Sequence, residues 1–159
     1  MIIDGLRHSQ GLPSGPTYGD LVYRGLEIGA YCDRGWIHTG LVKLANEHGI
    51  EGKAFRQSTV PRMLAEIQKD RPCIASVTIR LQGRLRRADG QLWRPGGHLS
   101  VVVGYEKEDN DVTAVIVNHP SSWSEYNWEC RPIELERFEA SFSGAFMSFW
   151  IPGDQTCSP

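Results

Sequence analysis

The segment between residues 98 and 119 constrains the fold more than any other part of the sequence. It holds two runs rich in β-branched residues, 99–106 and 112–117, separated by an all-polar connection at residues 107–111 that contains Asn110-Asp111. Two such runs joined by a short polar connection predict a β-hairpin. The chain should therefore contain at least one antiparallel pair of strands.

Polar side chains meet at the open end of this predicted hairpin. If its connection is centred near residues 108 and 109, His98 lies opposite Asn118 or His119. Directly opposed side chains point to the same face of a sheet, with Cβ atoms roughly 5 Å apart. An imidazole oriented by a polar neighbour is the base half of a nucleophilic triad. The plainer interpretation is a solvated histidine at the start of a strand.

The remaining pattern predicts helices ahead of the sheet. Helices are expected at residues 17–29 and 39–48, and a third begins at Ser58-Thr59 with Pro61 in its first turn. Strands at 73–79 and 145–151 and a short helix at 133–140 complete the pattern. Helices followed by an antiparallel sheet make an α+β fold. We expect one domain over residues 1–152 and a flexible tail at 153–159.

The first residues have an unusual pattern. Met1-Ile2-Ile3 is apolar from the start, and no capping residue precedes it, as if a helix had been entered midway. One interpretation is a short helix that docks on the core. The other is that residues of this domain preceded Met1.

Charge and composition exclude several classes of protein. The 159 residues suit one globular domain, and 17 Lys and Arg against 19 Asp and Glu leave no basic footprint for nucleic acid. No apolar run approaches the roughly 20 residues of a membrane span. No signal peptide leads the chain, and the cysteines lack a Cys-x-x-Cys pair, so we expect a cytoplasmic protein with reduced thiols. No cofactor is implied, and the oligomeric state is not readable.

The four cysteines were considered as nucleophiles and as metal ligands. Cys73 begins a predicted buried strand, Cys32 lies in a turn, Cys130 lies in a loop and Cys157 lies in the tail, so none begins a helix that would activate it. A zinc site formed by His38, His98, His119 and Cys130 lacks any local ligand spacing, and no metal is expected. The arginines between residues 80 and 94, with Trp93, fit either a site for phosphate or acidic peptide or a solvated hairpin.

Residues 95–105, Pro-Gly-Gly-His-Leu-Ser-Val-Val-Val-Gly-Tyr, resemble the histidine strand of papain-fold cysteine peptidases. The most similar branch is family thirty-nine, bacterial peptidases that cut double-glycine leaders from bacteriocin precursors. Residues 117–120, Val-Asn-His-Pro, resemble the strand end that carries the orienting Asp or Asn, and the likeness runs from about residue 17 to residue 151. It implies a papain-like α+β fold with N-terminal helices on a C-terminal antiparallel sheet.

The resemblance also implies roles for individual residues. His98 would be the catalytic base, and Asn118 or His119 would orient it. Trp123 would shield that contact from water, although ordinary packing explains a tryptophan equally well, and Gly97 would let a substrate backbone approach closely. The substrate would be a peptide or a small amide.

This sequence departs from the family pattern in two ways. The nucleophilic cysteine, which opens a central helix after a glutamine, has no matching position, and residues 1–3 look like the second turn of that helix. His119 stands where the family often has Asp, and a neutral ring there could accept a hydrogen bond but would repel an imidazolium. We therefore expect a thiol-dependent peptidase in the complete protein and no activity in this chain, or else a non-catalytic peptide-binding relative.

Overall fold

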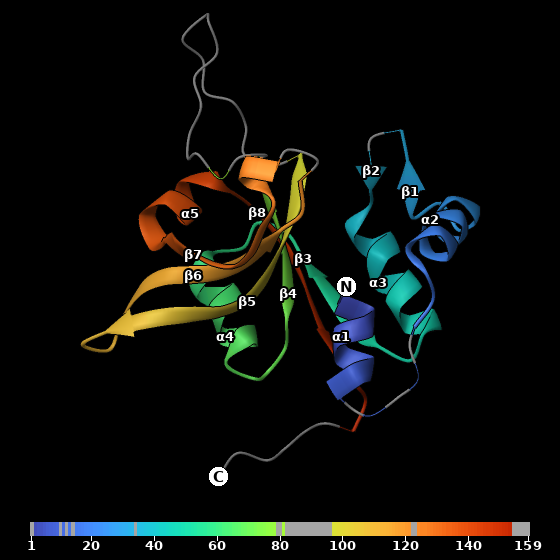
Figure 1. Ribbon diagram of the computed structural model, residues 1–159, viewed down its shortest axis with the longest axis horizontal. Helices are drawn as coiled ribbons and strands as arrows, with labels where there is room; N and C mark the ends of the chain where they lie inside the picture. The colour runs from blue at the N-terminus through green and yellow to red at the C-terminus, as the bar shows by residue number, and fades with distance from the viewer. Residues whose placement is uncertain are drawn as a thin grey trace, which may run out of the picture. The chain divides into compact units, whose positions relative to one another are not determined.

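The computed structural model describes residues 2–9, 11, 13, 15–33, 35–78, 81, 97–121 and 124–153 (Figure 1). The described chain divides into two compact units. The first unit comprises Met1–Ala54 and Met147–Pro159, and the second comprises Phe55–Phe146. The expectation of one domain with a tail stays a prediction. Within the described residues, no helix has the length and apolar character needed to cross a bilayer.

The first unit begins with helices, as expected. Its elements are α1 (Ile2–Ser9), α2 (Tyr18–Glu27), β1 (Tyr31–Cys32), β2 (Gly35–Trp36), α3 (His38–Glu47) and β3 (Glu51–Phe55, whose last residue belongs to the second unit). Thr17 caps α2 and exchanges hydrogen bonds with Asp20, which is a capping box. A Cβ atom at Gly40 would lie 2.5 Å from the backbone of Ala30, so only glycine lets α3 approach this closely.

The second unit carries most of the sheet. Its elements are α4 (Val60–Ile67), β4 (Cys73–Val77), β5 (His98–Glu108), β6 (Asp111–His119), the 3-10 turn η1 (Ser124–Tyr126), β7 (Trp128–Glu134), α5 (Leu135–Ser141) and the first part of β8 (Phe142–Trp150). Thr59 caps α4 by accepting a hydrogen bond from the Arg62 N–H, and Pro61 lies in the first turn as predicted. Such a cap stabilises a helix by about 1 kcal/mol.

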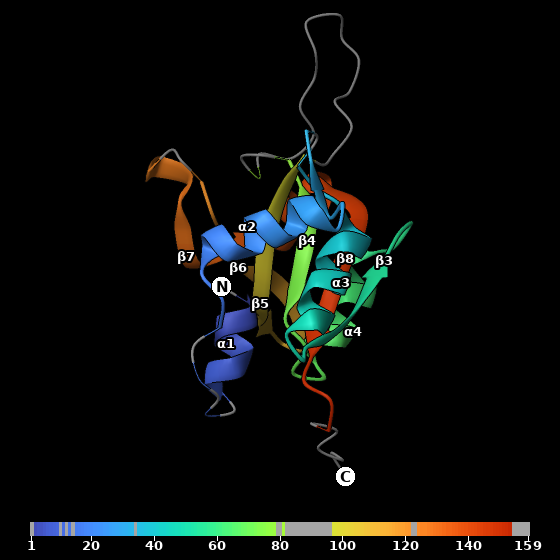
Figure 2. The same ribbon diagram turned by 90° about the vertical axis from the view of Figure 1, so that its right-hand side faces the viewer.

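Six of the strands form one sheet in the order β3-β8-β4-β5-β6-β7, which Figure 2 shows, and β1 pairs with β2 in a separate two-stranded sheet. The pairs β4–β5, β5–β6 and β6–β7 are antiparallel. Helices α4 and α5 contact these strands, and the largest fully buried side chains there include Met63, Phe138 and Phe146. The predicted α+β class, with helices first and an antiparallel sheet after them, is confirmed.

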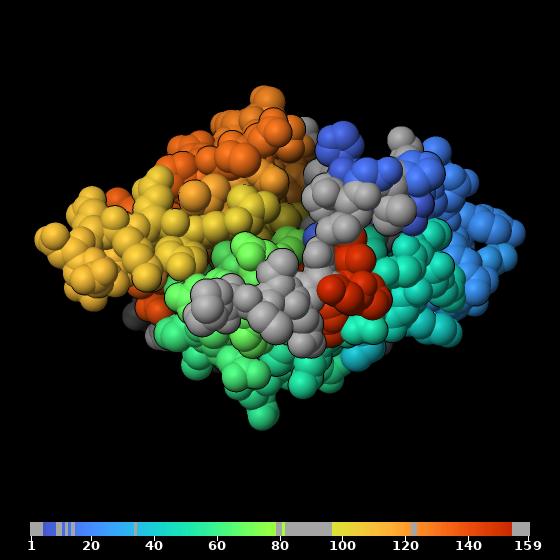
Figure 3. Space-filling model, turned by 90° about the horizontal axis from the view of Figure 1, so that it is seen from below, coloured from blue at the N-terminus to red at the C-terminus, as the bar shows by residue number. Residues whose placement is uncertain are grey.

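The hairpin is present, but its predicted centre and register are wrong. The turn consists of Asp109 and Asn110 alone, with φ angles of 48° and 76°. Two left-handed residues define the tight turn that matches strand twist, and Asp and Asn tolerate that conformation well. The polar residues before the turn continue β5 instead of forming the loop, and they project at the hairpin tip (yellow in Figure 3). The register is Val101 opposite Asn118, so neither Asn118 nor His119 directly opposes His98.

Several element boundaries also differ from those predicted. Residues 133 and 134 belong to β7, so the short helix begins only at Leu135, and the last strand begins at Phe142. β3 and β7 were not predicted, because they are edge strands with little apolar pattern: no residue of β3 is buried, and most residues of β7 are exposed.

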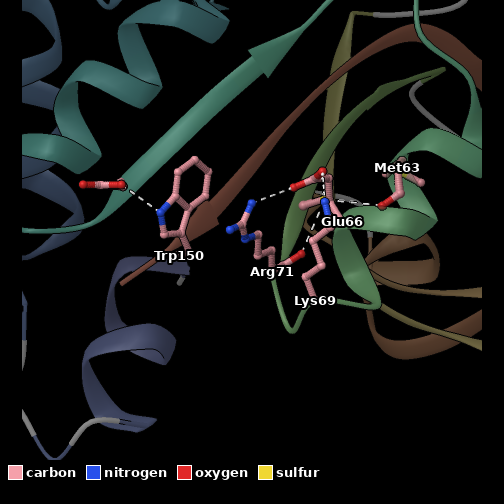
Figure 4. Close-up of polar contacts among 7 residues, drawn as sticks. Met63, Glu66, Lys69, Arg71 and Trp150 are labelled. Carbon is pink, nitrogen blue, oxygen red and sulfur yellow. Dashed lines mark hydrogen bonds and ion pairs between the residues drawn. The ribbon is translucent and has the colours of Figure 1, made fainter. Parts of the chain in front are cut away.

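A buried carboxylate lies near the end of α4. Glu66 is 3% exposed and bonds Lys69 at 3.0 Å and Arg71 at 3.1 Å (Figure 4). Burial alone would raise the pKa of the Glu66 carboxyl, but the hydrogen bonds from Lys69 and Arg71 outweigh it and hold the pKa below its usual value. This ion-pair cluster therefore keeps its charge inside the fold.

Candidate functional site

His98 is the first residue of β5, and a glycine lets the chain enter the strand there. Gly97 has a φ of +90°, a conformation that side chains disfavour. On its other side, His98 pairs with Val77 of β4, and its ring is half-buried. Its Nε2 atom is buried and has no hydrogen-bond partner among the residues that the structure describes.

His119 is the last residue of β6 and is fully buried. Its Nδ1 atom lies 2.7 Å from the carbonyl oxygen of Tyr126. A carbonyl can only accept, so Nδ1 carries the proton of the neutral ring and Nε2 is left as a lone pair. That Nε2 atom also lacks a partner.

The rings of His98 and His119 lie against each other, with centroids 4.4 Å apart and planes tilted by 32°. Continuing the pairing of Val101 with Asn118 would place His98 opposite Ser121. His119 stands two residues before that position, which makes it a diagonal neighbour of His98 on the same face. The two histidines predicted to meet do meet, by a different register from the one expected.

Asn118 points its side chain elsewhere. Its Oδ1 atom accepts a hydrogen bond of 2.6 Å from the backbone N–H of Cys130 in β7. Cys130 has a φ of 46° and lies where the β6–β7 register shifts, so the amide satisfies the irregular backbone of a bulge. The hydroxyl of Ser100 donates a hydrogen bond to the backbone carbonyl of Asn118. Of the two candidates, His119 is the one beside His98.

The surroundings favour the neutral form of His98. Burial lowers the pKa of His98, the neighbouring His119 lowers it further, and a hydrogen bond to the backbone of Pro120 partly opposes them. Proline has no N–H, so the ring of His98 must donate to its carbonyl, and because Nε2 is unpartnered the donor is Nδ1. Both rings then have Nε2 as their basic nitrogen.

A metal ion does not fit between these rings. Zn–N bonds of about 2.0 Å at a tetrahedral angle would hold two imidazole centroids roughly 5 Å apart, whereas these centroids are 4.4 Å apart. Among the residues that the structure describes, no group of three or more His, Cys, Asp and Glu side chains could hold a metal.

The described cysteines of the second unit are poor nucleophiles for His98. Cys73 is fully buried at the far end of β4, and burial, with a smaller effect of Glu66, raises the pKa of its thiol to about 12. Cys130 is exposed in the bulge of β7. In the first unit, the thiol of Cys32 donates to the Gly35 carbonyl.

Some predicted site residues lie outside the described part of the chain. These are Trp123, Gly96, Cys157 and most of the segment from residue 80 to residue 94, including Trp93. Sequence reasoning also missed a contact: Trp128 packs on the ring of His119 with centroids 5.3 Å apart. The pairing of β7 with β6 creates it, and only recognition of β7 as a strand would have suggested it.

Comparisons with known proteins agree with this architecture. Residues 28–145 match the family described as the Peptidase C39 like family. The peptidase domain of Streptococcus ComA, a bifunctional ABC transporter of a quorum-sensing pathway, has a TM-score of 0.60 at 16% identity, over 94% of this chain and 88% of that one. Its likeness extends to the fold.

Two further solved structures are more distant. A double-glycine motif protease from a PCAT transporter, in complex with the leader peptide, gives a TM-score of 0.47 at 21% identity over 74% of this chain and 62% of that one. A C39-like peptidase from Bacillus anthracis gives 0.49 at 15% identity over 72% and 59%. No curated protein matches the chain.

Proposed function

Because the chain belongs to the Peptidase C39 like family, we propose that the complete protein hydrolyses peptide or amide bonds through a cysteine thiol, with His98 as its general base and acid. The observation that carries the proposal is the contact between His98 and His119, whose rings are 4.4 Å apart at the open end of the β5–β6 hairpin. The ring is half-buried and its Nε2 atom is buried without a hydrogen-bond partner among the described residues, so that nitrogen is available to take up a proton from a group brought beside it.

In this proposal His98 takes the proton of the attacking thiol and later gives it to the leaving amine. The lowered pKa of His98 keeps the ring neutral and ready to accept a proton near neutral pH. His119 packs against the ring of His98 and helps to hold it in place, the orienting role that a carboxylate or amide often plays in triads. Gly97 leaves room beside His98 for a substrate backbone.

Residues 1–159 alone are proposed to be inactive. Of the described cysteines, Cys73 is unsuited because it is buried with a raised thiol pKa. Neither Cys130, in the β7 bulge, nor Cys32, in β1, begins a helix that would activate its thiol. The proposal therefore places the nucleophile elsewhere in the complete protein. A reducing compartment such as the cytoplasm would keep such a thiol active.

One observation favours a second function, non-catalytic binding of a peptide. Thiol peptidases work through an imidazolium that pairs with the thiolate, yet here burial and His119 both lower the pKa of His98. A domain that only grips a peptide has no need of the charged ring.

The test compares residues 1–159 with the complete natural protein on a panel of peptide amides, with and without an alkylating agent. We expect no turnover by residues 1–159 and thiol-sensitive turnover by the complete protein, lost in His98→Ala. Thiol-sensitive turnover by residues 1–159 would show that one of their own cysteines is the nucleophile. Peptide binding without turnover in the complete protein, little changed by His98→Ala, would establish the binding function instead.

A further inference from the structure

A short segment, from η1 to Trp128, holds the ring of His119, and the proposed mechanism gives this segment no role. The turn η1 ends at Tyr126, whose carbonyl oxygen bonds Nδ1 of His119 at 2.7 Å. Trp128 follows two residues later and packs on the same ring at 5.3 Å between centroids. Backbone and side chain of one segment therefore contact His119 at once.

Trp128 also secures the turn that supplies this carbonyl. Its indole N–H donates to the carbonyl of Glu125, inside η1, at 2.7 Å. The guanidinium of Arg131 lies 4.4 Å from the centre of the indole, within range for a cation–π contact. The indole is thus fixed at its edge and on its face, and the turn is fixed with it.

We propose that Trp128 is a positioning residue that locks the tautomer of His119, by holding the η1 turn so that the Tyr126 carbonyl takes the proton on Nδ1 and the unprotonated Nε2 stays on the ring that packs against His98. The inference deepens the proposed function and rests on it, since the tautomer presented to His98 matters only where His98 gains and loses a proton.

The physical argument is that a neutral imidazole has two tautomers, and the hydrogen bond made by one nitrogen decides which is present. His119 is fully buried, so water does not compete for Nδ1. The opposite tautomer would bury an N–H at Nε2, where no residue that the structure describes offers an acceptor, and would leave the Tyr126 carbonyl without this donor.

The experiment is nitrogen-15 NMR of the imidazole rings in residues 1–159, in the native chain and in Trp128→Phe. Phenylalanine keeps a ring against His119 but removes the indole N–H to Glu125. Trp150→Phe is the matched control, since the Trp150 indole makes an equivalent hydrogen bond of 2.8 Å to Glu51, within the first unit (Figure 4). Both variants thus lose one indole hydrogen bond, and only one of them loses it beside His119.

In the native chain we expect His119 to show a protonated Nδ1 and an unprotonated Nε2. Trp128→Phe should change the tautomer ratio roughly five- to tenfold toward Nε2–H, the effect of loosening one buried hydrogen bond. Trp150→Phe should leave the ratio unchanged. A native ring protonated on Nε2, or an unchanged ratio in Trp128→Phe, would overturn the inference.

Folding and activity are controlled separately. If Trp128→Phe does not fold, Trp128→Tyr replaces it, and the native spectrum alone still decides the tautomer. Turnover by the complete protein is a separate measurement. An inactive complete protein with a locked tautomer would refute the proposed function and leave the lock standing, whereas an active one with mixed tautomers would refute the lock alone.

Discussion

The second unit buries two polar clusters, which differ in whether their polar atoms have partners. The Glu66 cluster pairs a carboxylate with Lys69 and Arg71, so both carboxylate oxygens have cationic partners. The histidine cluster places His98 beside His119 and leaves the Nε2 atom of each ring unpartnered. Buried polar groups without partners cost stability, and natural proteins retain them mainly where they have a function. In the proposed function, we therefore assign the satisfied cluster to the fold and the unsatisfied one to the chemistry.

The largest expected effect comes from a substitution that breaks the histidine cluster. His98→Ala in the complete protein should lower kcat/KM by roughly a thousandfold, the usual contribution of general acid–base catalysis. The free energy of unfolding should fall by only about 1 kcal/mol, because the variant removes the hydrogen bond from the His98 ring to the Pro120 carbonyl. Peptide hydrolysis and thermal unfolding, measured on the same samples, check both statements. Turnover within a few-fold of the native rate would remove His98 from the mechanism.

The second-largest effect is expected from a substitution that breaks the Glu66 cluster. Glu66→Ala should destabilise the chain by about 2 kcal/mol, because it leaves Arg71 half-buried without its carboxylate. Urea unfolding measures the change. Glu27→Ala is the matched control: it removes the bond of 3.0 Å between Glu27 and Arg24, where both side chains are over 40% exposed, and should have little effect. Equal losses in the two variants would contradict the view that burial makes the Glu66 cluster structural.

The pH dependence of stability sharpens the comparison. The folded state lowers the pKa of Glu66, so its contribution is complete above the unfolded value of about 4.3 and is lost as pH falls through the lower folded value. The folded state also lowers the pKa of His98, so stability begins to fall once pH drops below about 6.5, where the unfolded chain binds the proton more readily. Urea unfolding between pH 3 and pH 8 should show both steps. His98→Asn should remove only the upper step and Glu66→Gln only the lower one.

The smallest effect is expected from a substitution that distinguishes the role of Asn118 from that of His119 at the end of β6. Asn118→Ala removes the acceptor for the Cys130 N–H and should cost about 1 kcal/mol in thermal or urea unfolding. Turnover by the complete protein should fall less than about threefold, because the Asn118 amide bonds β7. A loss of activity comparable to that of His98→Ala would show that Asn118, in spite of its contact with Cys130, orients the base.

The sequence predicted the class of the fold and the meeting of the two histidines, because both follow from long apolar runs and a polar connection. It did not predict the register, which depends on the left-handed conformations of Asp109 and Asn110 and on two irregularities along β5. His98 and His119 nevertheless meet, because they are diagonal neighbours in the actual register. The choice between Asn118 and His119 depended on β7 and on η1, which the sequence did not predict. The N–H of Cys130 in β7 bonds the amide oxygen of Asn118, and the carbonyl of Tyr126 in η1 bonds the ring of His119.

The most direct test of the central claim, that His119 is the working partner of His98, is an NMR titration of the His98 ring in the native chain, His119→Asn and Asn118→Ala. The account predicts a pKa for His98 below the usual range of histidine in the native chain, a higher pKa in His119→Asn and no change in Asn118→Ala. An unchanged pKa in His119→Asn, or a shift only in Asn118→Ala, would contradict the claim.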